Sequence, residues 1–473
     1  MKNRFLALAV VALFAPAAKA FASEPADASA KIEKPSHFKF YGFIRNYFAF
    51  DSRESKSGTK DLFYYIPKDE ALNAKGEDMN ANPTFRFLAI TSRVGLDVKD
   101  YQFGKTKVGA KIETDFYCMN GNVAVLRLRQ AYATLGWDGL GKDGKQSTSL
   151  KIGQAWHPIA ADQPYVIDLE TGTPFNPFSR TPQVMLDHNF SKNFTLTGGF
   201  IWQMQYLSVG PSYNKDKSKY ESKASDDYIK YGCIPEFYVG VTFKSNNGFL
   251  GRVGMDVLSI KPRWKDENDI KVNDRITTVN PYIYAQYSKG AFSVNGKVVY
   301  ASAGEHFNML SGYGVTDINS DGSWDYAPLH STASYLSVKY GRKLQVQGMI
   351  GYMKNLGLGT NKDLYSDTTI PGALVVGEPE NTKYTSSKYL YLSGNGFSNL
   401  NSIIRVTPTV VYNLGKLSFG LEYDITAAQY GKYPVLKAGD VVVPVVHSHN
   451  GLVDSGLHWI VNHRLLGMVK FTF

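Results

Sequence analysis

The sequence predicts an all-β protein: a transmembrane antiparallel β-barrel of about 16 strands, with short periplasmic turns and long extracellular loops. Three observations lead to this prediction. The chain begins with an export signal, apolar and polar residues alternate through most of it, and short connections alternate with long ones. A membrane barrel turns apolar side chains to lipid and polar ones to its lumen, which keeps the mean hydropathy low, here -0.25.

The first 22 residues have the pattern of a secretory signal peptide. Lys2 and Arg4 precede an apolar run over 5–14, and small residues allow cleavage after Ala20 or Ala22. The apolar run is shorter than the roughly 20 residues that a membrane helix needs. We therefore expect a signal peptide over 1–22, a short polar segment over 23–36 and the barrel over 37–473.

Alternation is clearest over 417–426, where Leu417, Phe419 and Leu421 share one face and Ser418, Gly420 and Glu422 share the other. An apolar face opposite a polar face is typical of a strand between lipid and water. Segments of this kind predict the following strands: 37–50, 84–98, 106–118, 122–137, 148–156, 182–190, 193–207, 232–244, 248–261, 274–288, 290–302, 332–341, 343–354, 402–413, 416–429 and 458–473.

The connections between these strands differ in length by side. Short turns rich in Gly, Asn and Ser lie at 103–105, 191–192, 245–247, 288–290, 341–343 and 414–415, with a longer one at 138–145. The long polar stretches lie at 51–83, 157–181, 208–231, 262–273, 303–331, 355–401 and 430–457, and one connection on that side, 120–122, is short. This asymmetry is typical of outer-membrane barrels.

Strand parity assigns several charged side chains to the lumen. Arg45, Arg93, Lys111, Arg127 and Arg129 come from four neighbouring predicted strands and should form a basic wall at a pore constriction. Arg405, on a later strand, points inward by the same rule and is a further predicted member of the basic wall. Such charges can select permeating ions, or they can pair with lumen carboxylates and fill space structurally, and the sequence leaves both readings open.

The loop over 157–181 follows the fifth predicted strand and is interrupted by proline. Its place after the fifth strand resembles that of the loop that folds into the lumen in general porins, and this resemblance implies that Asp162, Asp168 and Glu170 turn toward the basic wall. Opposed charges across a constriction would set a transverse field there.

Several segments, in order along the chain, resemble the DcaP-like trimeric porins. They are GFIR at 42–45, SRVGL at 92–96, KIETDF at 111–116, LRLRQAY at 126–132, GQAW at 153–156, TPQV at 181–184, GLEYD at 420–424 and QYG at 429–431. The resemblance implies a barrel of 16 strands, a homotrimer, and passive diffusion of small anionic solutes such as dicarboxylates. The chain ends in Phe473, which is similar to the closing-strand signal of outer-membrane proteins.

Composition and motifs bear on the other classes of function. The net charge of +10 suits anionic solutes and lipopolysaccharide and is modest for a nucleic-acid-binding protein. We found no nucleophile elbow, zinc-protease motif or glycine-rich phosphate loop, so we do not expect an enzyme. A structural or adhesive barrel with a blocked lumen, or a lipid-modifying enzyme, remains the alternative.

Three further features are candidate sites. The spacing of a Ca²⁺ loop occurs at Asp317, Asn319, Asp321 and Asp325. Position twelve of this loop is proline, so an ordinary polar surface loop is the alternative interpretation. We expect no other cofactor. His447 and His449 could chelate a metal, although two histidines alone are a weak signal. Cys118 and Cys233 lie at the ends of distant predicted strands, which predicts free thiols.

Overall fold

The barrel wall contains 16 antiparallel strands, as the sequence predicts. The computed structural model describes residues 37–118, 124–216, 219–358, 363–365, 368–369, 383–385, 389–394, 399–432, 435–438, 441–444, 446–447 and 456–473. The expected signal peptide, the segment over 23–36, the turn at 120–122 and His449 lie outside the described residues. In the part of the chain described, no helix is long and apolar enough to cross a membrane.

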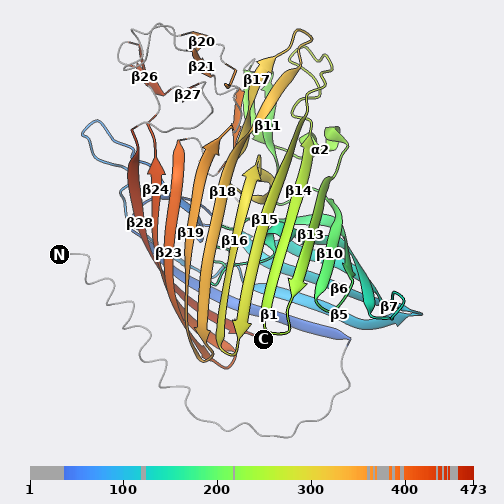
Figure 1. Ribbon diagram of the computed structural model, residues 1–473. Helices are drawn as coiled ribbons and strands as arrows, with labels where there is room; N and C mark the ends of the chain where they lie inside the picture. Colours follow the sequence, from blue (N-terminus) through green and yellow to red (C-terminus); the bar gives the residue numbers. More distant parts are fainter. Residues whose placement is uncertain are drawn as a thin grey trace, which may run out of the picture. The chain divides into compact units, whose positions relative to one another are not determined.

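Each wall strand pairs with its sequence neighbour, and β1 pairs with β28 to close the barrel (Figure 1). The wall consists of β1 (Phe38–Asp51), β4 (Thr84–Leu88) continued by β5 (Arg93–Phe103), β6 (Thr106–Cys118), β7 (Ala124–Leu140), β8 (Gln146–Trp156), β9 (Arg180–Asn189), β10 (Phe194–Ile201), β13 (Glu236–Lys244), β14 (Phe249–Ile260), β15 (Ile276–Lys289), β16 (Phe292–Ser302), β18 (Trp324–Gly341), β19 (Leu344–Gly357), β23 (Leu400–Leu414), β24 (Leu417–Tyr430) and β28 (His458–Thr472). Closure leaves no unpaired edge, which lipid could not satisfy.

The two faces of the wall differ in polarity as strand parity requires. On β24 the side chains of Leu421, Tyr423 and Ile425 are exposed, whereas Glu422 and Asp424 are buried in the interior. Exposed large apolar side chains recur in this way on every wall strand. Contact of so large an apolar surface with water would be unfavourable in free energy. Lipid covers this outer face, so the barrel spans a membrane.

One predicted strand, 84–98, is interrupted in the structure. Regular strand structure stops over 89–92, between β4 and β5, and Thr91 has a positive φ of 73°. Thr91 and Ser92 still make backbone hydrogen bonds to Phe116 of β6. The break turns Thr91 and Ser92 toward Arg45, whose side-chain Nη2 donates to Thr91 Oγ1 at 3.2 Å and whose backbone N–H donates to Ser92 Oγ at 3.0 Å. Hydropathy alternation does not detect this break, because apolar residues continue through it.

The predicted long connections contain further elements. A hairpin of β2 (Ser55–Gly58) and β3 (Phe63–Pro67) follows β1, a hairpin of β11 (Val209–Asn214) and β12 (Lys219–Ala224) leads to the helix α2 (Asp227–Gly232), and β17 (Gly312–Ile318) pairs with the first half of β18. The remaining short pieces are η2 (Pro158–Ala160), η3 (Glu305–Phe307), β20 (Thr368–Thr369), β21 (Lys383–Thr385), β22 (Leu390–Leu392), β25 (Val435–Ala438), β26 (Val441–Pro444) and β27 (Val446–His447).

These elements correct three predicted boundaries. β10 ends at Ile201 rather than at 207. β13 begins at Glu236 rather than at 232, because α2 extends to Gly232. β18 begins at Trp324 rather than at 332, because its first residues pair with β17. The short turns agree with the prediction, and Gly104, Gly290 and Gly415 have the positive φ values of 59°, 64° and 60° that tight hairpins demand.

Candidate functional site

The segment between β8 and β9, residues 157–179, crosses the interior of the barrel. Its backbone reaches wall strands far apart around the circumference. Tyr165 N–H donates to Ser337 Oγ of β18 at 3.0 Å, and Ile167 N–H donates to Glu422 of β24 at 2.7 Å. The hydroxyl of Tyr47 on β1 donates to the carbonyl oxygen of Ile167 at 2.5 Å. We call residues 157–179 the inner loop.

Lys297 of β16 binds the inner loop both near its start and near its end. Its Nζ donates to the carbonyl oxygens of Ile159 and Asp162 and to Asn176 Oδ1, each at 2.7 Å. Its side chain is buried, so these three acceptors replace the water that the ammonium group would otherwise require. The alternation of the predicted strand 290–302 places Lys297 inward, but the sequence does not indicate its partners.

Phe175 fastens the second half of the inner loop. Its ring is fully buried and packs on β19 at Gly351, where an added Cβ would lie 2.4 Å from the ring. Glycine therefore provides the space for the ring, and full burial of a phenylalanine stabilises the loop by about 1.5–3 kcal/mol.

The inner loop and the hairpin β2–β3 bound a cavity of about 390 Å³ in the lumen. Four arginines line it, Arg45, Arg93, Arg127 and Arg129, together with two carboxylates, Asp115 and Glu170. Aromatic side chains form much of the remaining lining: Phe63, Tyr65, Tyr117, Trp156, Phe178 and Tyr206. We call this space the basic cavity, because cations outnumber anions on its surface.

Carboxylates on β6 hold two of the arginines in place. Arg127 makes a two-pronged contact with Asp115, at 3.0 and 2.9 Å. Arg129 donates to Glu113 at 2.8 Å and to Asp115 at 2.6 Å. Such paired contacts fix the plane of a guanidinium group and so keep its position in the cavity.

Other guanidinium nitrogens in the same region have no hydrogen-bond partner. They are Nη1 of Arg45, Nε of Arg93, and both Nη atoms of Arg180. Arg180 stacks on Trp156 and Phe178, with its guanidinium carbon 4.9 and 5.0 Å from the two ring centres. Donors of this kind in a low-dielectric site favour a negatively charged solute.

Arg180 was not among the predicted basic residues. The alternation that turns Val184 and Leu186 to lipid would also turn Arg180 outward, yet its side chain is buried. Parity fails at this point because Arg180 begins the strand, where it leaves the inner loop.

Two predicted members of the basic wall lie elsewhere. Lys111 binds Asp97 and the hydroxyl of Tyr41, each at 2.8 Å, and does not line the basic cavity. Arg405 is buried behind the inner loop, where it donates to the carbonyl oxygens of Thr173 at 2.7 Å and Tyr65 at 2.8 Å. Arg405 therefore ties the inner loop and the hairpin β2–β3 to β23.

The three predicted acidic residues of the inner loop separate rather than forming one acidic side. Asp162 pairs with Arg252 of β14. Asp168 pairs with Arg464 of β28 at 2.9 Å. Glu170 alone lines the basic cavity, where it lies 2.8 Å from Lys470 and 3.5 Å from Arg45.

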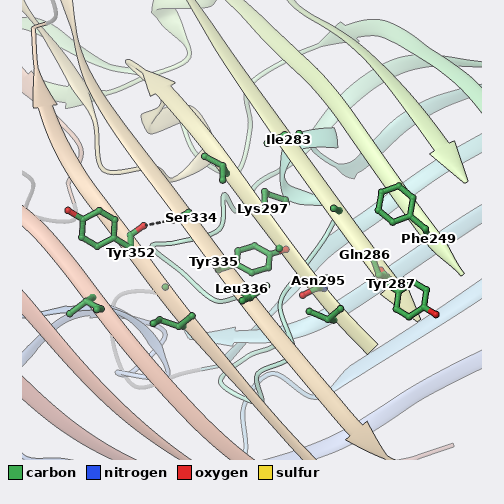
Figure 2. Close-up of a pocket in the computed structure, with 17 residues that line it drawn as sticks. Phe249, Ile283, Gln286, Tyr287, Asn295, Lys297, Ser334, Tyr335, Leu336 and Tyr352 are labelled. Atoms are coloured by element: carbon green, nitrogen blue, oxygen red, sulfur yellow. Dashed lines mark hydrogen bonds between the residues drawn. The ribbon is translucent and has the colours of Figure 1, made fainter. Parts of the chain in front are cut away.

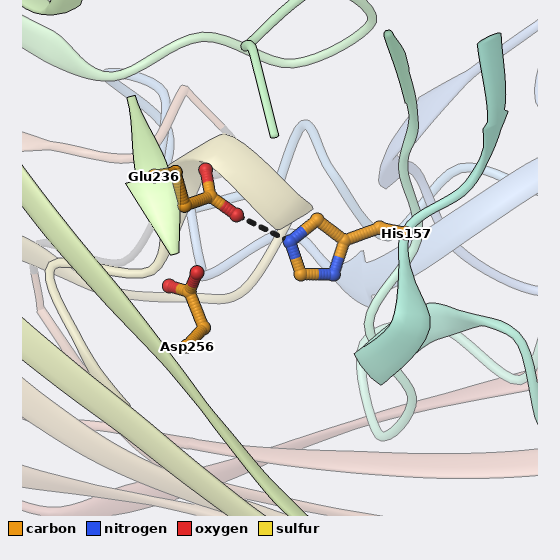
Figure 3. A group of neighbouring side chains, drawn as sticks. All are labelled: His157, Glu236 and Asp256. Carbon is orange, nitrogen blue, oxygen red and sulfur yellow. Dashed lines mark hydrogen bonds and ion pairs between the residues drawn. The ribbon is translucent and has the colours of Figure 1, made fainter. Parts of the chain in front are cut away.

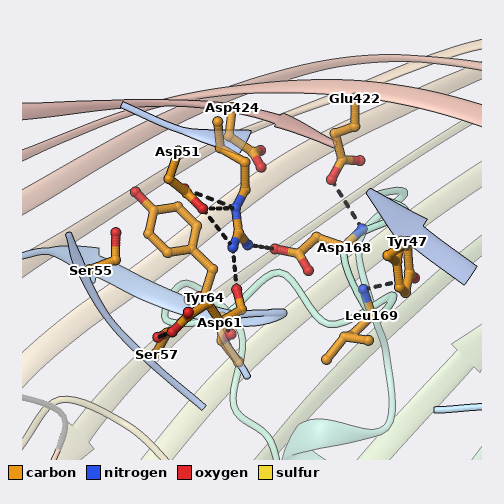
Figure 4. Close-up of polar contacts among 12 residues, drawn as sticks. Tyr47, Asp51, Ser55, Ser57, Asp61, Tyr64, Asp168, Leu169, Glu422 and Asp424 are labelled. Carbon is orange, nitrogen blue, oxygen red and sulfur yellow. Dashed lines mark hydrogen bonds and ion pairs between the residues drawn. The ribbon is translucent and has the colours of Figure 1, made fainter. Parts of the chain in front are cut away.

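Arg464 is the centre of the largest of these polar groups. Its guanidinium contacts Asp51 at 3.1 Å and Asp168 at 2.9 Å, and donates to the carbonyl oxygen of Asp61 (Figure 4). The ring of Tyr64 lies 4.6 Å from its guanidinium carbon. One buried arginine thereby joins β1, β28, the hairpin β2–β3 and the inner loop.

A second lumen cavity, of about 470 Å³, shares Trp156 and Ala161 with the basic cavity. It is lined by Lys151, Asp187 and Lys244, near the end of the barrel that carries the short turns. The two cavities lie next to each other beside the inner loop, and polar side chains line both of them.

A third hollow, of about 700 Å³, is larger than the two lumen cavities and lies on the wall itself, over β15, β16, β18 and β19. Ile283, Leu336 and Tyr352 border it among apolar side chains (Figure 2). These three side chains are exposed on the outer face, so acyl chains of the lipid would cover this hollow.

The residues of the predicted Ca²⁺ loop lie together around the β17–β18 turn. Their side chains are exposed there: Asp317, Asn319, Asp321 and Asp325. Asn319 Nδ2 donates to Asp325 Oδ1 at 3.3 Å, and the backbone N–H of Ser323 donates to Asp321 Oδ1 at 2.9 Å. Cys233 is a free, exposed thiol, and the side chain of Cys118 lies outside the described residues.

No protein-family model and no curated protein sequence matches the chain. Among solved structures it resembles the outer membrane channel DcaP of Acinetobacter baumannii, with a TM-score of 0.58 and 15% identity over 92% of this chain and 97% of that one. The chain has the fold of this channel. The predicted resemblance to DcaP-like barrels is confirmed at the level of the fold. A weaker likeness is to the anion-selective porin from Comamonas acidovorans, at a TM-score of 0.48 and 10% identity over 92% and 99% of the chains.

Proposed function

We propose that the protein is an outer-membrane porin for passive diffusion of small hydrophilic solutes, with a preference for anions such as dicarboxylates. The observation that carries this proposal is the basic cavity in the lumen, with four lining arginines against two lining carboxylates. A solute that passes along the lumen meets this cavity beside the inner loop.

The electrostatics of the cavity favour an anion. Two guanidinium nitrogens there, Nη1 of Arg45 and Nε of Arg93, have only a long ion pair with a carboxylate and no hydrogen bond, and an entering carboxylate could accept hydrogen bonds from them. The inner loop restricts the lumen, so the charge lies at the narrow part of the route, where it has the most influence on which ions pass.

The proposed setting is the outer membrane of a Gram-negative cell, with lipopolysaccharide and lipid around the barrel and a homotrimer as the assembly. The setting rests on the signal-peptide pattern of 1–22 and on the apolar outer face. The trimer rests on the resemblance to DcaP-like porins. The proposal includes no catalytic step.

A structural barrel with a blocked lumen is the second candidate, and one observation favours it. Inner-loop residues such as Ile159 and Phe175 join Phe307 and Met309 in an apolar cluster that fills part of the interior. A lumen closed by this cluster would pass no ions, so conductance separates the two candidates.

The test of anion preference uses replacement of Arg93, Arg127 and Arg129 by Ser. We expect the reversal potential in a planar bilayer under a KCl gradient to lose its preference for Cl⁻. The matched control replaces Lys105, Lys142 and Lys289, which are exposed at the turns, by Ser and removes the same charge.

The triple variant leaves Glu113 and Asp115 without the arginines that pair with them, which can impair folding. Arg93→Ser alone is therefore the second variant, because Arg93 lies 3.8 Å from Glu113 and contributes least to the ion pairs. Unchanged ion selectivity in both folded variants would contradict the role of these arginines.

A further inference from the structure

A second group of polar side chains lies inside the barrel, apart from the basic cavity. It consists of His157, Glu236, Asp256 and His306, which no predicted site includes. His157 begins the inner loop, Glu236 and Asp256 belong to β13 and β14, and His306 lies in η3, in the connection after β16. Figure 3 shows His157, Glu236 and Asp256 turned toward one another.

The possible ligand atoms of these side chains converge. One nitrogen of His157 and one oxygen each of Glu236 and Asp256 lie within 4.8 Å of one another. His306 Nε2 approaches from another side, 3.6 Å from Glu236 Oε2 and 3.4 Å from Asp256 Oδ2. Two imidazoles and two carboxylates from four elements therefore face one small space.

The protein does not satisfy the polar atoms of this group. All four side chains are at most 1% exposed. Even so, Glu236 Oε2, Asp256 Oδ1 and His306 Nδ1 have no hydrogen-bond partner. Two buried carboxylates beside each other repel, and each unsatisfied polar atom costs free energy. A bound cation would remove the repulsion and give the carboxylate oxygens a partner.

Other atoms of the group already have protein partners. Asn280 Nδ2 donates to Asp256 Oδ2 at 3.1 Å, which orients the carboxylate as a neighbour of a metal ligand does. His157 Nδ1 accepts a long hydrogen bond, 3.3 Å, from the backbone N–H of Ile159, so its proton is on Nε2, 2.5 Å from Glu236 Oε1. A metal ion bound at Nε2 of His157 would shift the imidazole proton to Nδ1. The hydrogen bond from the backbone N–H of Ile159 to Nδ1 would then be lost, which lowers the binding affinity.

We propose that His157, Glu236, Asp256 and His306 form a site for a divalent transition-metal ion such as Zn²⁺. Two imidazole nitrogens and two carboxylate oxygens are a donor set for Zn²⁺ and its neighbours in the first row. Ca²⁺ and Mg²⁺ prefer oxygen ligands throughout and fit this set less well.

The site joins parts of the chain that the wall does not join. Through His157 it would hold the start of the inner loop to β13 and β14, and through His306 it would hold η3 to the same strands. Its position makes it a clamp on the inner loop rather than a part of the solute route.

The test is binding of Zn²⁺ to the purified, chelator-treated barrel in detergent, measured by calorimetry and by metal analysis after dialysis. The absorption spectrum of bound Co²⁺ reports the ligand geometry. We expect one ion per chain, and an affinity at least tenfold lower in Glu236→Gln and in Asp256→Asn. Glu422→Gln is the matched control, because Glu422 is equally buried but contacts the inner loop elsewhere.

Folding of each variant is checked by the shift in gel mobility on heating. If the wall variants do not fold, His306→Gln replaces them, since His306 lies outside the wall, with His330→Gln as its control. Absence of Zn²⁺ binding to the folded wild type at micromolar concentrations would overturn the proposal, as would equal binding by wild type and the folded site variants.

Discussion

Single side chains account for the position of the inner loop. Lys297 binds three acceptors of the loop, Glu422 accepts two of its backbone N–H groups, and Arg464 pairs with Asp168. Each belongs to a different wall strand. The loop is therefore fixed at several points around the barrel rather than at its ends alone.

Replacement of Lys297 by Met should remove three of these contacts and leave the acceptors buried without donors. We expect the free energy of unfolding to fall by about 3 kcal/mol, because hydrogen bonds to a charged group and unsatisfied acceptors have costs of this order. Urea unfolding of the barrel in lipid vesicles measures the change. Lys289→Met, at the exposed end of β15, is the control, and equal stability of the two variants would contradict the anchoring role of Lys297.

The sequence predicted part of the site at this scale and missed part of it. Arg45, Arg93, Arg127 and Arg129 could be assigned to the lumen because a strand alternates its faces. Arg180 breaks that alternation at the start of its strand. The group around His157 could not be predicted, because its members come from four elements whose proximity depends on the closure of the barrel.

Two inward elements, the inner loop and the hairpin β2–β3, determine the shape of the lumen. The inward fold of the inner loop was expected from its place after the fifth strand, which resembles that of the constricting loop in general porins. The hairpin β2–β3 was not predicted. Its side chains pack against other parts of the barrel interior rather than between lipid and water, so its hydropathy does not alternate as that of a wall strand does. Both elements contribute side chains to the basic cavity.

Deletion of the hairpin, with residues 55–67 replaced by a short Gly-Ser linker, should widen the lumen beside the basic cavity. We expect a higher single-channel conductance and a weaker anion preference, because Arg45 and its neighbours would face a broader, more hydrated space. Planar-bilayer recordings measure both quantities. The barrel should still close, since the hairpin is not part of the wall. A folded deletion variant with wild-type conductance would show that the hairpin does not border the route.

For the whole molecule, the wall was the most predictable part. Lipid on one side and the lumen on the other impose an alternation on every wall strand, and that alternation is visible in the sequence. The connections carry no such constraint. Their short strands, as in β17 with β18, arise from pairing between segments that only the folded barrel brings together.

We propose above that this barrel is an open, anion-preferring channel. The single-channel conductance of the purified wild-type protein in a planar bilayer, with its reversal potential under a KCl gradient, tests this proposal. We expect openings in groups of three and a reversal potential that favours Cl⁻. A silent barrel would contradict the proposal and support a blocked structural barrel instead, and a reversal potential that favours K⁺ would contradict the role of the basic cavity.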